Sequence, residues 1–222
     1  HARLTYNKVN DMLIDADAPQ RESLRAEYKT VVPHLETLHD LYKVLQDARV
    51  ERGAIDFETT EVRIVFGEER KIDRIVPVVR NDAHKLIEEC MLCANVAAAD
   101  FLSSHELPGL YRVHGKPSVE KLDNLREFLD GLGLRLEGEY SPRAANYRDL
   151  LEQIKGRPDA HLIQTVLLRS MLQAVYSPDN EGHFGLSFDA YAHFTSPIRR
   201  YPDLLMHRAI RSVIRSRKQS AK

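Results

Sequence analysis

Cysteine is scarce in this sequence of 222 residues, and long apolar stretches are absent from it. Cys90 and Cys93 form a lone C-x-x-C pair, with no second pair to complete a zinc site or a disulfide framework. We therefore interpret both as small packing residues and expect a reducing, cytoplasmic compartment. A membrane-spanning helix needs about 20 consecutive apolar residues. No run approaches that length, so the sequence predicts no membrane partner.

An excess of either charge is also missing. The chain holds 32 Lys and Arg against 33 Asp and Glu, so its overall charge gives no reason to bind a polyanion, and a nucleic-acid site has to rest on a local patch. Residues 199–222 form such a patch, with eight Lys or Arg and one acid, Asp203. The sequence opens on His1 without a charged-then-apolar leader, and we expect it to be a segment of a longer protein.

Hydrophobic periodicity predicts a mostly helical α+β fold with a β-hairpin and short strands, as part of a single domain over residues 1–222. The apolar stripe of residues 82–103 contains several small side chains, and Asn81 or Asp82 can cap that helix. A further strand is expected to begin at Phe57. The expected helices cover residues 34–49, 82–103, 118–132, 147–155, 159–175 and 198–217, with a hairpin at 62–66 and 72–79 and a strand at 110–113.

Residues 177–197 differ from the rest, because Pro and Gly interrupt them and aromatic and histidine rings crowd them. This composition indicates an irregular functional loop. Ser196 and Pro197 then lead into a helix with Arg199 and Arg200 near its start. Backbone N–H groups and guanidinium groups there could form a phosphate site, or the helix could simply be capped with its arginines in solvent. Arginine in a first turn opposes the helix dipole, so it needs a further reason to be there.

The segment 191–208 closely resembles the signature of the RNB catalytic domain of the ribonuclease II/ribonuclease R family. Further blocks that resemble the family occur in the family's order along the chain, at residues 2–6, 52–58, 80–91, 110–114 and 182–186. Members of this family degrade RNA processively from the 3′ end to 5′-mononucleotides. The resemblance implies the same activity here, and it favours the ribonuclease R branch of the family.

The resemblance also implies roles for residues of the signature segment. Arg199 matches the arginine that contacts the region of the scissile phosphate, and its neighbour Arg200 is the weaker candidate for a catalytic role. Guanidinium suits this task because it stays charged and can hold two phosphate oxygens at once. His193 and Ser196 are expected to contact the RNA.

Ribose and base contacts are implied for three residues outside that segment. Glu88 and Tyr6 match the residues that recognise the 3′-terminal ribose, and a carboxylate and a phenol can each bond a 2′-hydroxyl. Periodicity alone does not choose between Glu88 and Glu89. Phe57 matches a phenylalanine that stacks on a base, although without the resemblance its ring is better read as core.

A metal is implied by the resemblance, but its ligands are not expected in this chain. The family uses Mg²⁺ held by four aspartates, and that cluster lies upstream of the block that matches residues 2–6. Asp11, Asp15 and Asp17 have a different spacing, so we do not interpret them as ligands.

We expect a monomeric enzyme that acts on the 3′ end of single-stranded RNA. The alternative is a non-catalytic RNA-binding module or scaffold.

Overall fold

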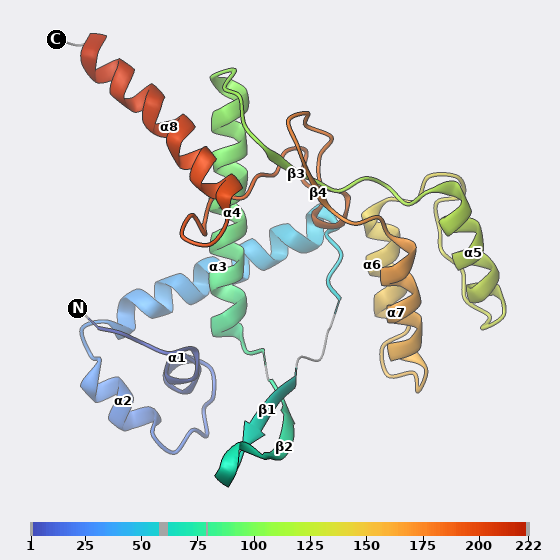
Figure 1. The fold of residues 1–222 in the computed structure, drawn as a ribbon. Helices are drawn as coiled ribbons and strands as arrows, with labels where there is room; N and C mark the ends of the chain where they lie inside the picture. The colour runs from blue at the N-terminus through green and yellow to red at the C-terminus, as the bar shows by residue number, and fades with distance from the viewer. Residues whose placement is uncertain (1, 58–61, 79, 221–222) are drawn as a thin grey trace. The chain divides into compact units, whose positions relative to one another are not determined.

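The computed structural model describes residues 2–57, 62–78 and 80–220, and Figure 1 gives their helices and strands. The chain divides into two compact units. The first comprises His1–Asp47 and Glu58–Cys90, and the second comprises Ala48–Phe57 and Met91–Lys222. Over the described residues, none of the helices combines the length and the apolar character that crossing a membrane requires.

The first unit begins with two short helices that the sequence did not lead us to expect. They are α1 (Tyr6–Leu13) and α2 (Arg21–Glu27). Thr5 caps α1, since its hydroxyl accepts a hydrogen bond from the Lys8 backbone N–H. Their apolar sides meet the start of α3 (Val32–Arg52) in a small core. The buried members of this core are Met12, Leu24 and Val32.

A β-hairpin follows α3, as the sequence predicts. Strands β1 (Val62–Phe66) and β2 (Ile72–Pro77) pair antiparallel, and the short 3₁₀ helix η1 (Glu68–Arg70) connects them. The second strand ends at Pro77, which is the register partner of Val62 and has no backbone N–H to donate. Phe57 carries no regular structure, and the residues in which a strand from Phe57 was expected to continue, 58–61, lie outside the described part of the chain.

The long helix α4 (Asp82–Ser104) begins where the sequence predicts. Asn81 caps it, because its side-chain oxygen accepts a hydrogen bond from the His84 backbone N–H. The C-terminal part of α4 belongs to the second unit, where its small residues Ala98 and Ala99 are buried against Met206 of helix α8 (Tyr201–Ser220). Small side chains of α4 therefore form part of the core that α8 also enters.

The second core of this unit lies among three helices that stand together in Figure 1. These are α5 (Val119–Asp130), α6 (Ala144–Gln153) and α7 (Ala160–Ser170). Leucines and isoleucines at helical spacing fill the space between them. The fully buried ones, with no exposed area, are Leu129, Ile154, Ile163 and Leu167.

One predicted helix is too long. The pattern predicted a helix over 159–175, but α7 ends at Ser170, and Met171 is already extended. The Lys121 ammonium donates to the carbonyls of Arg169 and Met171, which satisfies groups exposed where the helix stops. Beyond it, β4 (Val175–Ser177) pairs antiparallel with β3 (Tyr111–Val113). A strand partner distant in sequence therefore overrides the apparent helical period.

Candidate nucleic-acid interface

The signature loop before α8 is fastened from α4 by a single buried side chain. Asn95 is only 3% exposed. Its amide nitrogen donates to the Tyr191 hydroxyl at 2.9 Å, and its amide oxygen accepts from the Phe194 backbone N–H at 2.9 Å. His207 of α8 stacks on the Phe194 ring, and its Nε2 lies 2.9 Å from the Phe194 carbonyl oxygen. The loop is thus fixed on both sides of Phe194.

A second buried side chain fixes the loop where it enters α8. Asp203 has no exposed area, and its Oδ1 accepts hydrogen bonds from the Ser196 backbone N–H at 2.7 Å and from Arg200 Nη2 at 2.8 Å. Burial alone would raise the pKa of the Asp203 carboxyl. The hydrogen bonds from Arg200 and Ser196 and the charge of Arg200 outweigh burial, so the pKa lies below its usual value. Asp203 is therefore an ionised, paired carboxylate.

The two neighbouring arginines consequently differ in what they can do. Arg200 is held by Asp203, whereas the side chain of Arg199 is exposed to solvent. Helix α8 begins at Tyr201, so both arginines precede its first turn. The backbone N–H groups of Arg199 and Arg200 both point to the Ser196 carbonyl, at 3.3 and 3.0 Å. These two backbone groups are therefore not free to bind a phosphate, whereas the Arg199 side chain is exposed to an anion.

His193 of the signature loop contacts two tyrosine rings, Tyr176 of β4 and Tyr191 of the loop itself. His193 Nδ1 lies 2.7 Å from the Tyr176 hydroxyl, and its ring meets Tyr191 edge to face. Burial lowers the pKa of His193 to about 4, with a further lowering by the charge of Arg200 and an opposing effect of Asp203. His193 is therefore neutral near pH 7. Any contact that it makes with RNA is a neutral hydrogen bond or a ring contact.

His183 belongs to the same group of rings. It packs edge to face on His114 and on Tyr191. Burial, followed by the proximity of His114, lowers the pKa of His183 to about 4. Its Nδ1 accepts a hydrogen bond from the Leu186 backbone N–H. His183 therefore holds the segment 183–187 in place as a neutral imidazole.

The predicted ribose contacts lie in the first unit, and Tyr6 and Glu88 flank one histidine there. Tyr6 is 45% exposed, and its ring stacks on His84 with ring centres 4.1 Å apart. Glu88 follows His84 by one helical turn of α4, so the two share a face. The partly exposed Glu88 carboxylate forms an ion pair with Arg80, whereas Glu89 is buried. Of the two glutamates, Glu88 is accordingly the accessible one.

A pocket opens beside Tyr6. Its volume is about 400 Å³. It is lined by Thr5, Tyr6, Asn7, Arg63, Pro77, Val78 and His84. The sequence reasoning gave His84 no role in this site. In the structure, the Asn81 side-chain oxygen that caps α4 also lies 2.7 Å from His84 Nδ1, and it holds the ring that stacks on Tyr6.

Phe57 lies in the second unit, beside its helical core. Phe57 is partly buried against the core of α5, α6 and α7, so its contact with a base remains a prediction.

Cys90 is partly buried but Cys93 is exposed. A role as a small packing residue is therefore compatible with Cys90, whereas Cys93 lies on an exposed part of α4.

The acidic residues near the start of the chain make local contacts. Asp11 accepts a hydrogen bond from the Gln20 amide, and Asp15 accepts one from the Asp17 backbone N–H. Among the residues that the structure describes, no group of three or more His, Cys, Asp or Glu side chains is arranged to hold a metal ion. The carboxylates in the described ranges thus do not fit a Mg²⁺ site.

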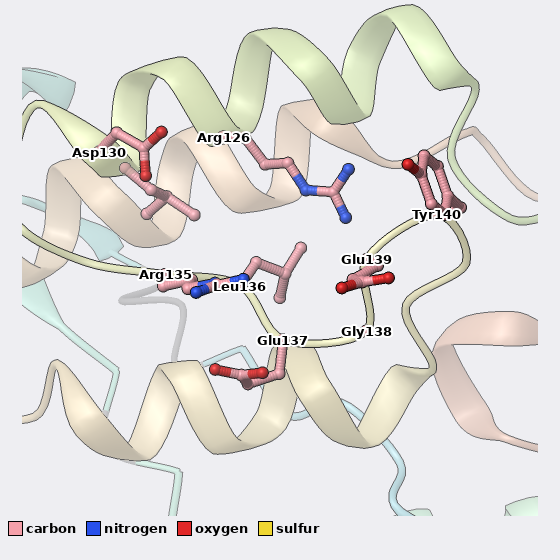
Figure 2. Close-up of a pocket in the computed structure, with 9 residues that line it drawn as sticks. Arg126, Asp130, Arg135, Leu136, Glu137, Gly138, Glu139 and Tyr140 are labelled. Carbon is pink, nitrogen blue, oxygen red and sulfur yellow. The ribbon is translucent and has the colours of Figure 1, made fainter.

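A separate pocket of about 540 Å³ lies beside α5. Figure 2 shows the Arg126 side chain pointing from α5 toward the segment 136–140. The pocket lining includes two arginines, Arg126 and Arg135, and three acids, Asp130, Glu137 and Glu139. Its charges are mixed, and its lining contains neither the signature loop nor the residues around Tyr6. This pocket is therefore not the predicted site.

Comparison with known proteins gives consistent matches over this chain. A family model described as the RNB domain matches residues 1–216. Ribonuclease R of Vibrio cholerae is 58% identical over 214 residues, which are 96% of this chain and 26% of that protein. Ribonuclease R of Escherichia coli is 54% identical over the same shares of the two chains.

A solved structure agrees with these matches. It is titled as Mycoplasma genitalium RNase R in complex with ribose methylated single-stranded RNA. It matches with a TM-score of 0.82 and 30% identity, over 94% of this chain and 32% of that chain. The chain thus spans about a quarter of the length of the curated relatives named above. The chain belongs to the RNB domain family, within which it is similar to ribonuclease R along nearly its whole length.

Proposed function

We propose that residues 1–222 are part of a single RNB catalytic domain in a 3′-to-5′ exoribonuclease. The complete enzyme would be a cytoplasmic monomer that starts at the 3′ end of single-stranded RNA and releases 5′-mononucleotides. One observation carries the proposal. The family's signature loop is fixed by buried polar bonds from Asn95 and Asp203, and it leaves the guanidinium of Arg199 exposed.

The proposed chemistry of Arg199 follows from its fixed charge. A guanidinium can donate two parallel hydrogen bonds to a phosphate, and it stabilises the negative charge that grows on the phosphate oxygens during hydrolysis. Arg200 is already engaged by a buried carboxylate. Its part in catalysis is therefore to keep the turn that carries Arg199 in shape.

Ribose recognition is the proposed role of Tyr6 and Glu88. A 2′-hydroxyl can both donate and accept, so a carboxylate and a phenol are suitable partners for it. Tyr6 is about half exposed, and its ring stacks on His84 of α4. Glu88 follows His84 by one turn of α4. Phe57 as a base contact, and His193 and Ser196 as RNA contacts, belong to the same proposal.

Dependence on Mg²⁺ is also part of the proposal, with ligands from outside these residues. The described carboxylates do not form a metal site. The residues of this chain would therefore bind and orient the phosphate and the ribose.

Degradation of labelled RNA by the complete protein tests this function. We expect single-stranded RNA with a 5′ label to shorten from its 3′ end in Mg²⁺, with mononucleotides as the released product. A 3′-phosphorothioate terminus and excess chelator are suitable controls, because each should slow the reaction. Internal cuts, or degradation from the 5′ end, would contradict the proposal.

We keep one second function, a non-catalytic RNA-binding module or scaffold, because the exposed Arg199 and Tyr6 could contact RNA without hydrolysing it. If the complete protein binds RNA in Mg²⁺ but releases no nucleotides under any divalent cation, this second function replaces the first. For the segment 1–222 by itself, we expect no robust Mg²⁺-dependent cleavage under either function.

A further inference from the structure

We propose that Asn95 is a positioning residue that holds the loop bearing Arg199 in its reactive position. The proposal rests on the role of Arg199 described above. Asn95 lies on α4, far along the sequence from the signature segment, and is 3% exposed. It has no access to substrate in that position, so it can act only through the residues that it contacts.

The hydrogen-bond partners of Asn95 determine which way its amide faces. The Phe194 backbone N–H can only donate, so the amide atom facing it at 2.9 Å must be the oxygen. The amide nitrogen then faces the Tyr191 hydroxyl, also at 2.9 Å, and donates to it. Donor and acceptor are thus both used, and asparagine is the side chain of this size that offers one of each.

Placement of these bonds explains why they matter for Arg199. The loop runs from Tyr191 to Arg199, and side chains from two helices hold it at intervals. Asn95 holds Tyr191 and Phe194, and Asp203 takes the Ser196 backbone N–H. Arg199 follows three residues after Ser196, whose carbonyl accepts its backbone N–H. Removal of Asn95 would loosen the loop before this turn and leave the partly buried Phe194 N–H without its acceptor.

The expected consequence is a loss of rate with little loss of affinity. A small displacement of a group that contacts the reacting phosphate can lower the rate by up to about 100-fold. RNA binding depends on many contacts, so it should be much less sensitive. Asn95→Leu keeps the approximate size of the side chain and removes both hydrogen bonds.

Single-turnover cleavage of single-stranded RNA by the complete protein tests the proposal. We expect Asn95→Leu to lower the cleavage rate about tenfold or more while the Kd for RNA changes less than about threefold. Asn146→Leu is the matched control, because Asn146 caps α6 through the Arg143 backbone N–H and does not contact the loop. This control should cleave at the wild-type rate. Equal losses in both variants would overturn the proposal.

A double-mutant cycle separates positioning from a general structural role. In an Arg199→Lys background, Asn95→Leu should cause little further loss, because the group that Asn95 positions is already gone. Losses that multiply would mean that Asn95 acts on the whole fold, and would overturn the proposal. If Arg199→Lys is slow but Asn95→Leu keeps the full rate, the positioning role alone is wrong. If Arg199→Lys keeps the full rate, the function proposed for Arg199 fails first.

Tyr191→Phe keeps the test decisive if Asn95→Leu does not fold. It removes one hydroxyl and leaves the bond between Asn95 and Phe194 in place. We expect a two- to fivefold lower cleavage rate with Arg199 present and no loss with lysine at that position, as for other small losses of orientation. An unchanged rate, or the same loss in both backgrounds, would overturn the proposal.

Discussion

The Asp203 carboxylate accepts a hydrogen bond from Arg200 at 2.8 Å, and Asp203 has no exposed area. Arg199, the preceding residue, has its side chain in solvent. Two adjacent arginines therefore serve different purposes, since one neutralises a buried carboxylate and the other remains accessible. Their substitution should separate stability from activity.

Arg200→Ala should lower the free energy of unfolding by about 3 kcal/mol, because it leaves the buried Asp203 charge without its cationic partner. Arg199→Ala is the matched control, and it should change that free energy by less than about 0.5 kcal/mol. Denaturant unfolding followed by circular dichroism measures both values. Equal stability of the two variants would show that the pair with Asp203 contributes little.

Replacement of Glu88 by Ala together with Tyr6 by Phe should narrow the preference for RNA over DNA by about one to two decades in relative rate. A group that bonds the 2′-hydroxyl is left unpaired on DNA, at a cost of roughly 1–3 kcal/mol. Cleavage of matched RNA and DNA oligomers by the complete protein measures the ratio. DNA handling should hardly change.

Glu89→Ala is the control for that experiment. Glu89 is buried whereas the Glu88 carboxylate is partly exposed, so its replacement should affect the thermal melt without changing the RNA-to-DNA ratio. A changed RNA-to-DNA ratio for Glu89→Ala, with an unchanged ratio for the double variant, would show that Glu89 rather than Glu88 recognises the ribose.

Elements with a strong periodic pattern were predictable from the sequence. Helices α3 and α4 and the hairpin lie close to their expected ranges. An apolar stripe at helical spacing marks α4, and two short β-branched runs around a Gly-containing connection mark the hairpin. Helices α1 and α2 are short, and the sequence did not predict them. The end of α7 depends on Lys121 of α5 and on pairing of β4 with β3, which are contacts between distant residues. No local pattern could predict these contacts.

In the candidate site, too, some residues could be predicted from the sequence and others depend on contacts with distant residues. Resemblance already favoured Arg199 over Arg200, and the buried Asp203, which pairs with Arg200, supplies the physical reason. Asn95 and His84 were not singled out, because a helical Asn or His has no distinctive local pattern. Their roles depend on partners, Phe194 for Asn95 and Tyr6 for His84.

The free energy of unfolding should fall as the pH is lowered from about 6.5 to about 4. The pKa values of His183 and His193 are near 4 in the folded chain, against about 6.5 in the unfolded chain. Between these values the unfolded state binds protons that the folded state does not, so acid favours unfolding. The lowered pKa of Asp203 acts only below about 3.8, outside this window.

His193→Gln isolates one of these histidines. Glutamine can still bond the Tyr176 hydroxyl but does not titrate, so unfolding of this variant near pH 5 should take up about one proton fewer than wild type. The pH dependence of denaturant unfolding gives this number. An identical pH dependence for wild type and variant would mean that His193 keeps an ordinary pKa in the folded chain.

Single-turnover cleavage by the complete protein with Arg199→Lys tests the central claim most directly. Lysine keeps the positive charge but not the planar fork that holds two phosphate oxygens. We predict a cleavage rate lowered by about tenfold or more and an RNA affinity that is nearly unchanged. A variant that binds RNA more weakly but cleaves bound RNA at the wild-type rate would contradict the claim, because Arg199 would then only tether the substrate.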